Sequence, residues 1–354
     1  MSAADTSPPD ADRAGASPSP RVSQSLIGHS AAELALLRAW QAGRLPHALL
    51  ICGPEGIGKA TLAWRLAKFL LAHPDATSPE ALGARDLSLP LDHPVALRVA
   101  HGSHADVSVL RREWNDKTKK HFTEIRIDDV RKIIDKFHLA PAETRWRIAI
   151  VDAADDLNRS GANALLKLIE EPPANALFLI IAHRPGQLLA TLRSRCQRID
   201  LSPLNARDLA DVLHGLRPDL AKANLDAAAA GAEGSVREGL ERLDDANRSL
   251  DAQLARLLAS LPQPDWREIH AATDLVARAG QERAFARLLT GLEAFLGIKL
   301  HDAVADGWPL TRLNALAAAQ TRMAQAAGQA EALNLDRRAL VMGMFRDLVT
   351  ATSP

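Results

Sequence analysis

The stretch ALLICGPEGIGKAT, residues 48–61, constrains the fold of this chain more than any other segment. Five apolar residues, suited to a buried parallel strand, lead into a glycine-rich turn, and Lys59 opens a helical pattern. Backbone N–H groups, a helix N-terminus and a lysine together bind phosphate, so this spacing predicts a P-loop. A glycine turn with an incidental lysine is the alternative. The predicted phosphate-binding residues are Gly53, Gly56, Gly58 and Lys59.

Strand and helix patterns alternate from residue 31 to residue 201, which favours a parallel sheet covered by helices. The predicted strands are 48–52, 104–110, 146–152, 176–182 and 196–201, and the predicted helices are 31–41, 59–72, 128–139 and 161–171. After Pro203 the strand patterns stop, and the remaining sequence is rich in Ala, Leu and Arg with helical character. The expected fold class is therefore α/β, with helical segments after the sheet.

The chain has 354 residues, enough for two to three domains. The predicted regions are a disordered Ser/Pro-rich tail over 1–22, a P-loop domain over 23–203, a helical lid over 204–248 and an all-α domain over 249–354. Long Ala/Leu faces at 254–261 and 285–298 predict that the last region is an oligomerisation surface. A self-contained helical bundle is the alternative.

Charge and cysteine content exclude several classes of protein. Lys+Arg and Asp+Glu both number 43, so a uniformly basic DNA-coating protein is excluded. Two cysteines cannot form a disulfide scaffold, and no run of about 18 apolar residues is present, so we expect a soluble, cytoplasmic protein. Residues 111–122, the basic segment, carry five Lys/Arg against two acids and are expected to form an exposed loop. Whether this segment touches DNA is open.

The groups that ATP hydrolysis requires are incomplete. Ala60 stands where a hydroxyl should bind Mg²⁺, and Thr61 follows about 100° further round the helix. Asp152 ends a predicted strand, where it could hold a metal-bound water, but Ala153 replaces the Glu that polarises the attacking water. The sequence therefore predicts a nucleotide-hydrolase fold that has lost hydrolysis.

Three segments carry a family resemblance: LPHALLICGPEGIGKAT (45–61), VDAADDLNRSGANALLKLIEEPP (151–173) and LLATLRSRC (188–196). Together they resemble the AAA+ clamp-loader subunits, and an intact SRC beside an incomplete ATP site most resembles their delta-prime type in bacterial DNA polymerase III. The resemblance implies an AAA+ P-loop sheet, a helical lid and an all-α collar. It also implies a non-hydrolysing stator in DNA replication; an active ATP-hydrolysing motor subunit is the alternative.

The resemblance also implies roles for single residues. Arg195, between Ser194 and Cys196, would enter the ATP site of a neighbouring subunit, where a guanidinium neutralises charge on the transferred phosphoryl group. A surface arginine in an ion pair is the alternative. His183 takes the place of a γ-phosphate sensor, and Arg237 matches a lid arginine, with a solvent-facing helix arginine as the alternative. Thr61 and Asp152 complete the degenerate nucleotide site.

Partners and cofactors follow from the same resemblance. It implies a hetero-pentamer with motor subunits of gamma/tau type and a delta subunit, which acts on a sliding clamp and primed DNA. We expect no cofactor: ATP binding should be weak or absent. The four-cysteine zinc module usual in the family should fall at 73–104, but that stretch has no cysteine and four histidines, so zinc is not expected. Those histidines are His73, His93, His101 and His104.

Overall fold

The computed structural model describes residues 19–353, except 24, 91, 119, 279–280 and 334–335. The predicted disordered tail therefore lies almost entirely outside the described residues. The chain divides into two compact units, Met1–Glu241 and Arg242–Pro354, which are described separately below. Within the described residues, none of the helices is long and apolar enough to cross a membrane.

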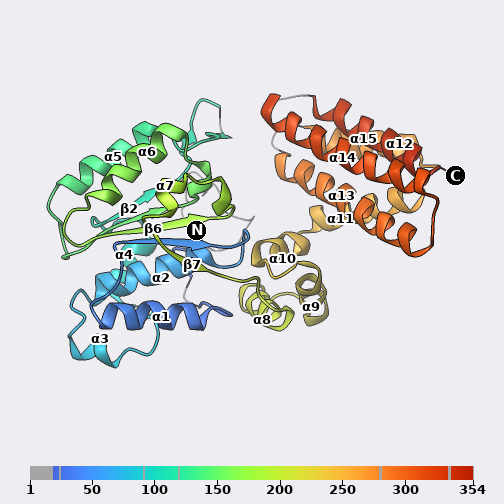
Figure 1. The fold of residues 1–354 in the computed structure, drawn as a ribbon. Helices are drawn as coiled ribbons and strands as arrows, with labels where there is room; N and C mark the ends of the chain where they lie inside the picture. Colours follow the sequence, from blue (N-terminus) through green and yellow to red (C-terminus); the bar gives the residue numbers. More distant parts are fainter. Residues whose placement is uncertain are drawn as a thin grey trace. The chain divides into compact units, whose positions relative to one another are not determined.

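A five-stranded sheet forms the centre of the N-terminal unit (Figure 1). Its strands run in the order β2-β5-β6-β1-β7, and every neighbouring pair is parallel. The strands are β1 (Ala48–Cys52), β2 (Val107–Leu110), β5 (Arg147–Val151), β6 (Ala176–Ala182) and β7 (Gln197–Asp200). The parallel sheet with flanking helices confirms the expected fold class. β1 and β6 coincide with their predicted bounds, because each is a continuous apolar run buried on both faces.

Helices cover both faces of the sheet (Figure 1). Side chains alternate between the faces along β1, so Leu49 and Ile51 join one core while Leu50 and Cys52 join the other. The first core is completed by α1 (Ser30–Gln41), α2 (Lys59–Ala72), α3 (Pro79–Gly83) and α4 (Pro94–Ala100). The second is completed by α5 (Ile127–His138), α6 (Arg159–Glu170) and α7 (Ala190–Arg193).

Two connecting segments contain more structure than the sequence predicted. The sequence analysis predicted no helix or strand over 74–103, yet this stretch holds α3 and α4, each with a proline in its first turn. The basic segment was expected to be a loop, but it forms a short antiparallel hairpin. The hairpin strands are β3 (Trp114–Asn115) and β4 (Lys120–His121), and the short 3₁₀ turns of the unit are η1 (Ala154–Asp156) and η2 (Pro185–Gln187).

Short helices follow the last strand. They are α8 (Ala206–Leu216), α9 (Lys222–Gly231) and α10 (Val236–Leu243). Leu209, Leu213 and Leu225 are buried between them, and the N–H of Leu204 donates to the carbonyl of Gly234 at 3.1 Å. This helical segment agrees with the predicted end of the strands after Pro203. Its function as a lid stays a prediction.

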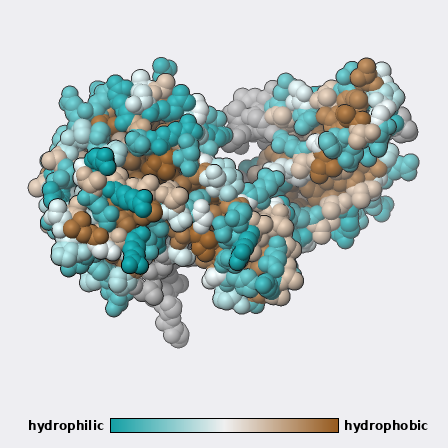
Figure 2. Space-filling model, turned by 60° about the horizontal axis from the view of Figure 1, so that its bottom comes forward, coloured by the Kyte–Doolittle hydropathy of each residue, from teal (hydrophilic) through white to brown (hydrophobic). Residues whose placement is uncertain are grey.

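The C-terminal unit is a helical bundle with one core of its own. Its helices are α11 (Asp245–Ala259), α12 (Trp266–Ala277), α13 (Glu282–Ala305), α14 (Leu310–Leu333) and α15 (Arg337–Thr352). Leu254, Leu257, Leu288 and Leu292 lie in this core, so the faces that suggested oligomerisation pack largely within the chain itself. Figure 2 shows apolar patches among hydrophilic side chains on the visible face of this unit. Oligomerisation through this unit stays a prediction.

Candidate functional site at the two edges of the sheet

The carboxyl ends of β1, β5 and β6 meet at one edge of the sheet, which we call the carboxyl edge. A cavity of about 340 Å³ lies there, within the range of small-molecule sites. Predicted site residues that line it are Gly56, Gly58, Lys59, Thr61, Asp152, His183 and Arg237. The fold thus brings together residues from four separate segments. Gly53 is not part of the lining.

The ammonium group of Lys59 is bound by its own loop. The side chain is buried, 3% exposed, and Nζ donates to the carbonyl of Gly53 at 2.7 Å and to the carbonyl of Pro54. Burial lowers the pKa of Lys59 to about 8. A phosphate group that approached Lys59 would have to replace these two carbonyls as the acceptor of its N–H groups.

The positions at which the sequence analysis expected hydrolytic groups to be missing lie in the lining of the cavity or directly beside it. Ala60 and Thr61 both line it, and the methyl group of Ala60 offers no oxygen to Mg²⁺. Asp152 lies at the end of β5 in the same lining, and the next residue, Ala153, is buried. No side chain at position 153 can therefore orient an attacking water.

His183 is placed by a residue that the sequence analysis missed. The carboxylate of Asp155 accepts hydrogen bonds from the backbone N–H groups of His183 at 2.6 Å and Arg184 at 2.7 Å. These bonds tie the end of β6 to the turn after β5. The acidic run in VDAADD was visible in the sequence, but its pairing with a backbone 28 residues away was not.

Arg237 faces the P-loop, so the solvent-facing alternative is wrong, and its partner belongs to the same chain. Its guanidinium contacts the carboxylate of Glu55, a P-loop residue without an assigned role in the sequence analysis. Ser235 Oγ donates to the carbonyl of Glu55 at 2.9 Å, and the N–H of Val236 donates to the carbonyl of Gly56, also at 2.9 Å. The start of α10 is thus bound directly to the P-loop.

The chain that precedes α1 also contacts this site. His29 is buried, and its Nε2 donates to the carbonyl of Ile57 at 2.6 Å. Nζ of Lys68, on α2, donates to the carbonyl of Ser23 at 3.0 Å, and burial lowers the pKa of Lys68 to about 8. Ile27 lines the cavity between these two attachments. The cavity is therefore bounded by segments from both ends of the N-terminal unit.

The SRC motif fills the link between α7 and β7. Arg195 extends outward with 41% of its side chain exposed, and its Nε lies 2.6 Å from Glu170 Oε1 at the end of α6. Its Nη1 donates to the carbonyl of Thr191 at 3.1 Å and to Ser194 Oγ at 3.4 Å. The guanidinium therefore takes part in an ion pair, as the alternative interpretation of this residue expected.

The two residues beside Arg195, Ser194 and Cys196, stabilise the link between α7 and β7. Ser194 Oγ donates to the carbonyl of Thr191 at 3.0 Å, which closes the last turn of α7. Cys196 packs against the core beneath α6, and burial raises the pKa of its thiol to about 11. A neutral, half-buried thiol is a packing group and a poor nucleophile. Ser194 and Cys196 thus hold the backbone from which Arg195 extends.

The register of the sheet separates Arg195 from the cavity of its own chain. Leu49 at the start of β1 pairs with Gln197, and Cys52 at its end pairs with Asp200. Arg195 therefore lies at the amino ends of β1 and β7, which we call the amino edge, whereas the P-loop begins after Cys52. A strand of five residues spans roughly 16 Å, since each residue adds about 3.3 Å. Arg195 therefore lies at the edge of the sheet opposite the P-loop of its own chain.

The histidines of 73–104 each contact a neighbour in or next to their own segment. No group of three or more His, Cys, Asp or Glu side chains is placed to share a metal ion within the described residues. The absence of zinc stays a prediction. The four contacts are His73 with the ring of Phe69, His93 Nδ1 with the N–H of Val95, His101 Nδ1 with the carbonyl of Leu97, and His104 Nδ1 with the N–H of Asp106.

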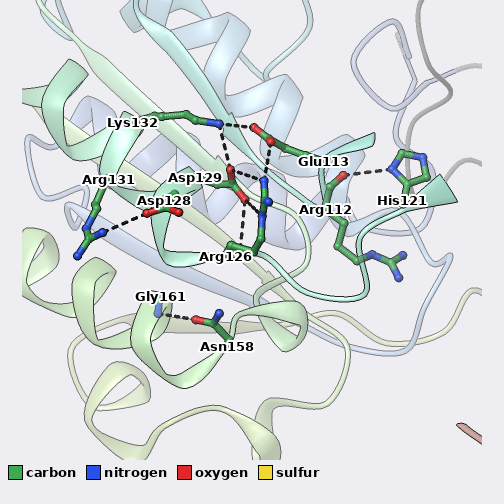
Figure 3. A network of polar contacts seen from close by, with 10 residues as sticks. All are labelled: Arg112, Glu113, His121, Arg126, Asp128, Asp129, Arg131, Lys132, Asn158 and Gly161. Atoms are coloured by element: carbon green, nitrogen blue, oxygen red, sulfur yellow. Dashed lines mark hydrogen bonds and ion pairs between the residues drawn. The ribbon is translucent and has the colours of Figure 1, made fainter. Parts of the chain in front are cut away.

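The basic segment is held against α5 by charges of both signs (Figure 3). Glu113 accepts from Arg126 at 3.0 Å and from Lys132 at 2.7 Å. Arg112 lies 3.0 Å from Asp156 of η1. The network engages Arg112 in an ion pair and fixes the hairpin on the helix. Contact between this segment and DNA stays untested.

Comparisons with known proteins give the family of this chain. A family model described as DNA polymerase III, delta subunit, matches residues 28–205, half of the chain. The matched range runs from the segment before α1 to the residue before α8, so it includes the P-loop, Asp152, His183 and Arg195.

Relatives among curated proteins are DNA polymerase III subunits. The tau subunit of Escherichia coli is 27% identical over 324 residues, which cover 87% of this chain and 48% of that protein. The delta′ subunit of Pseudomonas aeruginosa is 36% identical over 151 residues, which cover 42% of this chain and 41% of that protein. This chain thus spans about half the length, or less, of these relatives. A gamma subunit-related protein of Thermotoga maritima aligns with 90% of this chain and 100% of its own at 17% identity and a TM-score of 0.41.

Proposed function

We propose, given that this chain belongs to the DNA polymerase III delta subunit family, that it is a delta-prime-type clamp-loader subunit in DNA replication. In this role it hydrolyses no ATP and supplies Arg195 to the ATP site of a neighbouring subunit. Its partners are motor subunits of gamma/tau type and a delta subunit, in a hetero-pentamer that acts on a sliding clamp and primed DNA.

The position of Arg195 at the amino edge carries this proposal. An arginine that served its own chain would have to reach the carboxyl edge, yet the register places Arg195 at the opposite end of β1. A guanidinium supplied by a neighbouring subunit stabilises charge on the transferred phosphoryl oxygens, worth about 10³–10⁵ in rate in GTPase systems. A partly exposed arginine that is held by Glu170 at the edge opposite its own P-loop fits that task.

The carboxyl edge supports the absence of hydrolysis. Ala60 cannot bind Mg²⁺ and Ala153 cannot orient water, while Lys59 and Arg237 both bind oxygen atoms of their own chain. We propose that this P-loop is a structural part of the subunit and that nucleotide binding is weak or absent. No bound metal is required for that role.

The main test is Arg195→Ala in a complex reconstituted with its motor and delta subunits. Folding and assembly should be unchanged, because an exposed ion pair contributes little to stability. Clamp-stimulated ATP hydrolysis should fall by the share of the one site that borders this subunit, and clamp loading on primed DNA should fall with it.

Arg193 and Arg198 provide matched controls for this test. Arg193 donates to the carbonyl of Pro185, and Arg198 pairs with Asp200 along its own strand. Their alanine variants should behave nearly as wild type. Full activity of the Arg195→Ala complex, or equal losses in all three variants, would remove Arg195 from the mechanism.

An active motor subunit is the second candidate. Lys59 and the cavity are present, and the tau subunit of Escherichia coli matches 87% of this chain. Under that alternative, the isolated chain or the complex should show ATP turnover that Lys59→Ala in this chain abolishes. Under our proposal, the isolated chain shows no turnover, and Lys59→Ala leaves the turnover of the complex unchanged.

For assembly we propose the C-terminal unit as the main contact surface. Its large leucines pack in its own core, but Ile298, Val304 and Leu310 are 60–77% exposed. The double variant Ile298→Asp, Leu310→Asp should weaken co-purification with the motor subunits. Leu82→Asp, an exposed apolar residue of the N-terminal unit, is the control. Unchanged co-purification of the double variant would place the assembly surface elsewhere.

A further inference from the structure

We propose that Glu170 is a positioning residue that holds Arg195 in the orientation required by the neighbouring ATP site. This inference rests on the proposed function, because it assigns Glu170 a role in the same transfer of charge to another subunit. It depends on three features of the amino edge: how the guanidinium is bonded, where Glu170 lies on its helix, and what fixes that helix end.

The guanidinium of Arg195 is held through two of its three nitrogens. Its Nε lies 2.6 Å from Glu170, and its Nη1 donates to the carbonyl of Thr191 and to Ser194 Oγ. Within the part of the chain that the structure describes, Nη2 donates no hydrogen bond. Glu170 and Thr191 thus orient the planar group and leave one nitrogen with two N–H groups for an acceptor outside this chain.

The place of Glu170 on its helix is unfavourable for the helix itself. It is the last residue of α6, where the helix dipole is negative and favours cations. A carboxylate there gains nothing from the helix end, so helix stability does not explain it. An exposed ion pair also adds little to folding stability. Its effect on the direction of the guanidinium is therefore the stronger explanation.

The end of α6 is a firm mount. His47, which precedes β1, donates from Nε2 to the carbonyl of Ile169 at 3.1 Å, in the last turn of the helix. Pro172 and Pro173 follow and prevent the helix from continuing. Leu168 and Ile169 are buried in the core under the sheet. Glu170 thus projects from a backbone that is attached to β1 and to the core.

An arginine has several rotatable bonds, and ordering it only in the transition state would cost entropy at the moment of reaction. An arginine already held in a fixed plane avoids that cost. The carboxylate also competes for the charge of Arg195, but its contact is with Nε, and Nη2 keeps its own N–H groups for another acceptor. If Glu170 positions Arg195, the rate of ATP hydrolysis should fall when Glu170 is changed. If Glu170 instead withholds the charge of Arg195 from the neighbouring site, the rate should rise.

The experiment measures ATP hydrolysis and clamp loading by the complete complex with Glu170→Gln. We expect kcat to fall several-fold, to a value between wild type and Arg195→Ala, with KM for ATP unchanged because binding of ATP is not affected. Glu170→Asp should recover part of the loss. The double variant Glu170→Gln, Arg195→Ala should equal Arg195→Ala alone, since Glu170 acts only through Arg195.

Glu171→Gln is the matched control, an adjacent exposed carboxylate that should leave kcat unchanged. Equal melting temperatures and equal assembly of all variants separate positioning from folding. Full activity of Glu170→Gln beside an impaired Arg195→Ala would overturn this inference and leave the proposed function intact. A higher rate, or additive losses in the double variant, would also overturn it. Full activity of Arg195→Ala would instead overturn the proposed function.

Discussion

The two edges of the central sheet differ in what their cationic groups bind. At the carboxyl edge, the buried ammonium of Lys59 donates to loop carbonyls and Arg237 pairs with Glu55, so both cations are engaged within the chain. At the amino edge, Arg195 is 41% exposed and is bonded through only part of its guanidinium. The cations of the carboxyl edge are bound within the chain, whereas the guanidinium at the amino edge is partly exposed. The comparison teaches that the residue types alone do not tell which cations are bound within their own chain.

The largest expected effect concerns Arg195 at the amino edge. Arg195→Lys should lower single-turnover hydrolysis at the bordering site roughly 10³-fold, nearly as far as Arg195→Ala, because a point charge lacks the planar fork. The measurement uses a complex in which only the motor subunit that borders this chain keeps its P-loop lysine. Arg198→Lys is the control. Recovery of most of the rate by lysine would mean that only the charge of Arg195 matters.

The next effect tests the closure of the carboxyl edge. A Cβ at Gly56 would lie 2.3 Å from Ser235 Oγ and 2.5 Å from Arg237 Cβ, and the backbone φ is +79°. Gly56→Ala should therefore lower the free energy of unfolding by about 1–3 kcal/mol, measured by urea denaturation. Gly186→Ala, with open space around the added carbon, is the control. Equal stability of both variants would mean that α10 does not pack on the P-loop in solution.

A third prediction concerns the internal partner of Arg237. Glu55→Gln removes the carboxylate that occupies the guanidinium, so the affinity of the isolated chain for tripolyphosphate should rise about tenfold, or ~1.4 kcal/mol. Competition titration calorimetry measures the change. Glu171→Gln, at the other edge, should leave the affinity as it is. A fall in affinity with Glu55→Gln would show that Glu55 organises the loop for anions.

The smallest effect is a pH dependence. The pKa of Lys59 is lowered by burial from 10.5 in the unfolded chain to about 8. Between these values the unfolded chain binds more protons, so the free energy of unfolding should rise with pH, by about 1 kcal/mol from pH 8 to pH 9. Below pH 8 this contribution should be flat. Urea denaturation of wild type and Lys59→Met across pH 7–10 isolates it, because the variant lacks this rise.

Exposed Lys167→Met is the control for the pH series and should keep the full rise. Lys68 has a similarly lowered pKa and remains in all three proteins, so its contribution cancels in the comparison. Identical slopes in wild type and Lys59→Met would mean that the amine of Lys59 is solvated in solution.

Periodicity predicted the sheet well and the connections poorly. β1 and β6 could be read from the sequence because a strand buried on both faces is an uninterrupted apolar run. The hairpin of the basic segment could not be predicted from the sequence. Its strands have two residues each, too few to show an alternation of apolar and polar residues. The apolar faces at 254–261 and 285–298 showed that those helices are buried on one side. They did not show which surface these helices pack against. Most of their buried leucines lie in the core of the C-terminal unit itself.

The amino-acid sequence by itself determined which chemical groups each region possesses. Ala60 and Ala153 supply no ligand or base wherever the chain folds, and the glycines with Lys59 predict a phosphate loop from local geometry alone. These features are contiguous along the chain, so local pattern is enough. The family resemblance added the interpretation of Arg195, but not its surroundings.

Only the tertiary structure decided which charges meet. Glu55 and Arg237 are 182 residues apart, and β6, η2 and α7 lie between Glu170 and Arg195 along the chain. Such ion pairs follow neither the helical nor the strand period and have no fixed spacing along the chain. No sequence pattern therefore predicts them. The register of β1 with β7 likewise placed Arg195 at the edge away from its own P-loop. Parallel strands carry their two ends to opposite edges, and that separation keeps this arginine away from the P-loop of its own chain.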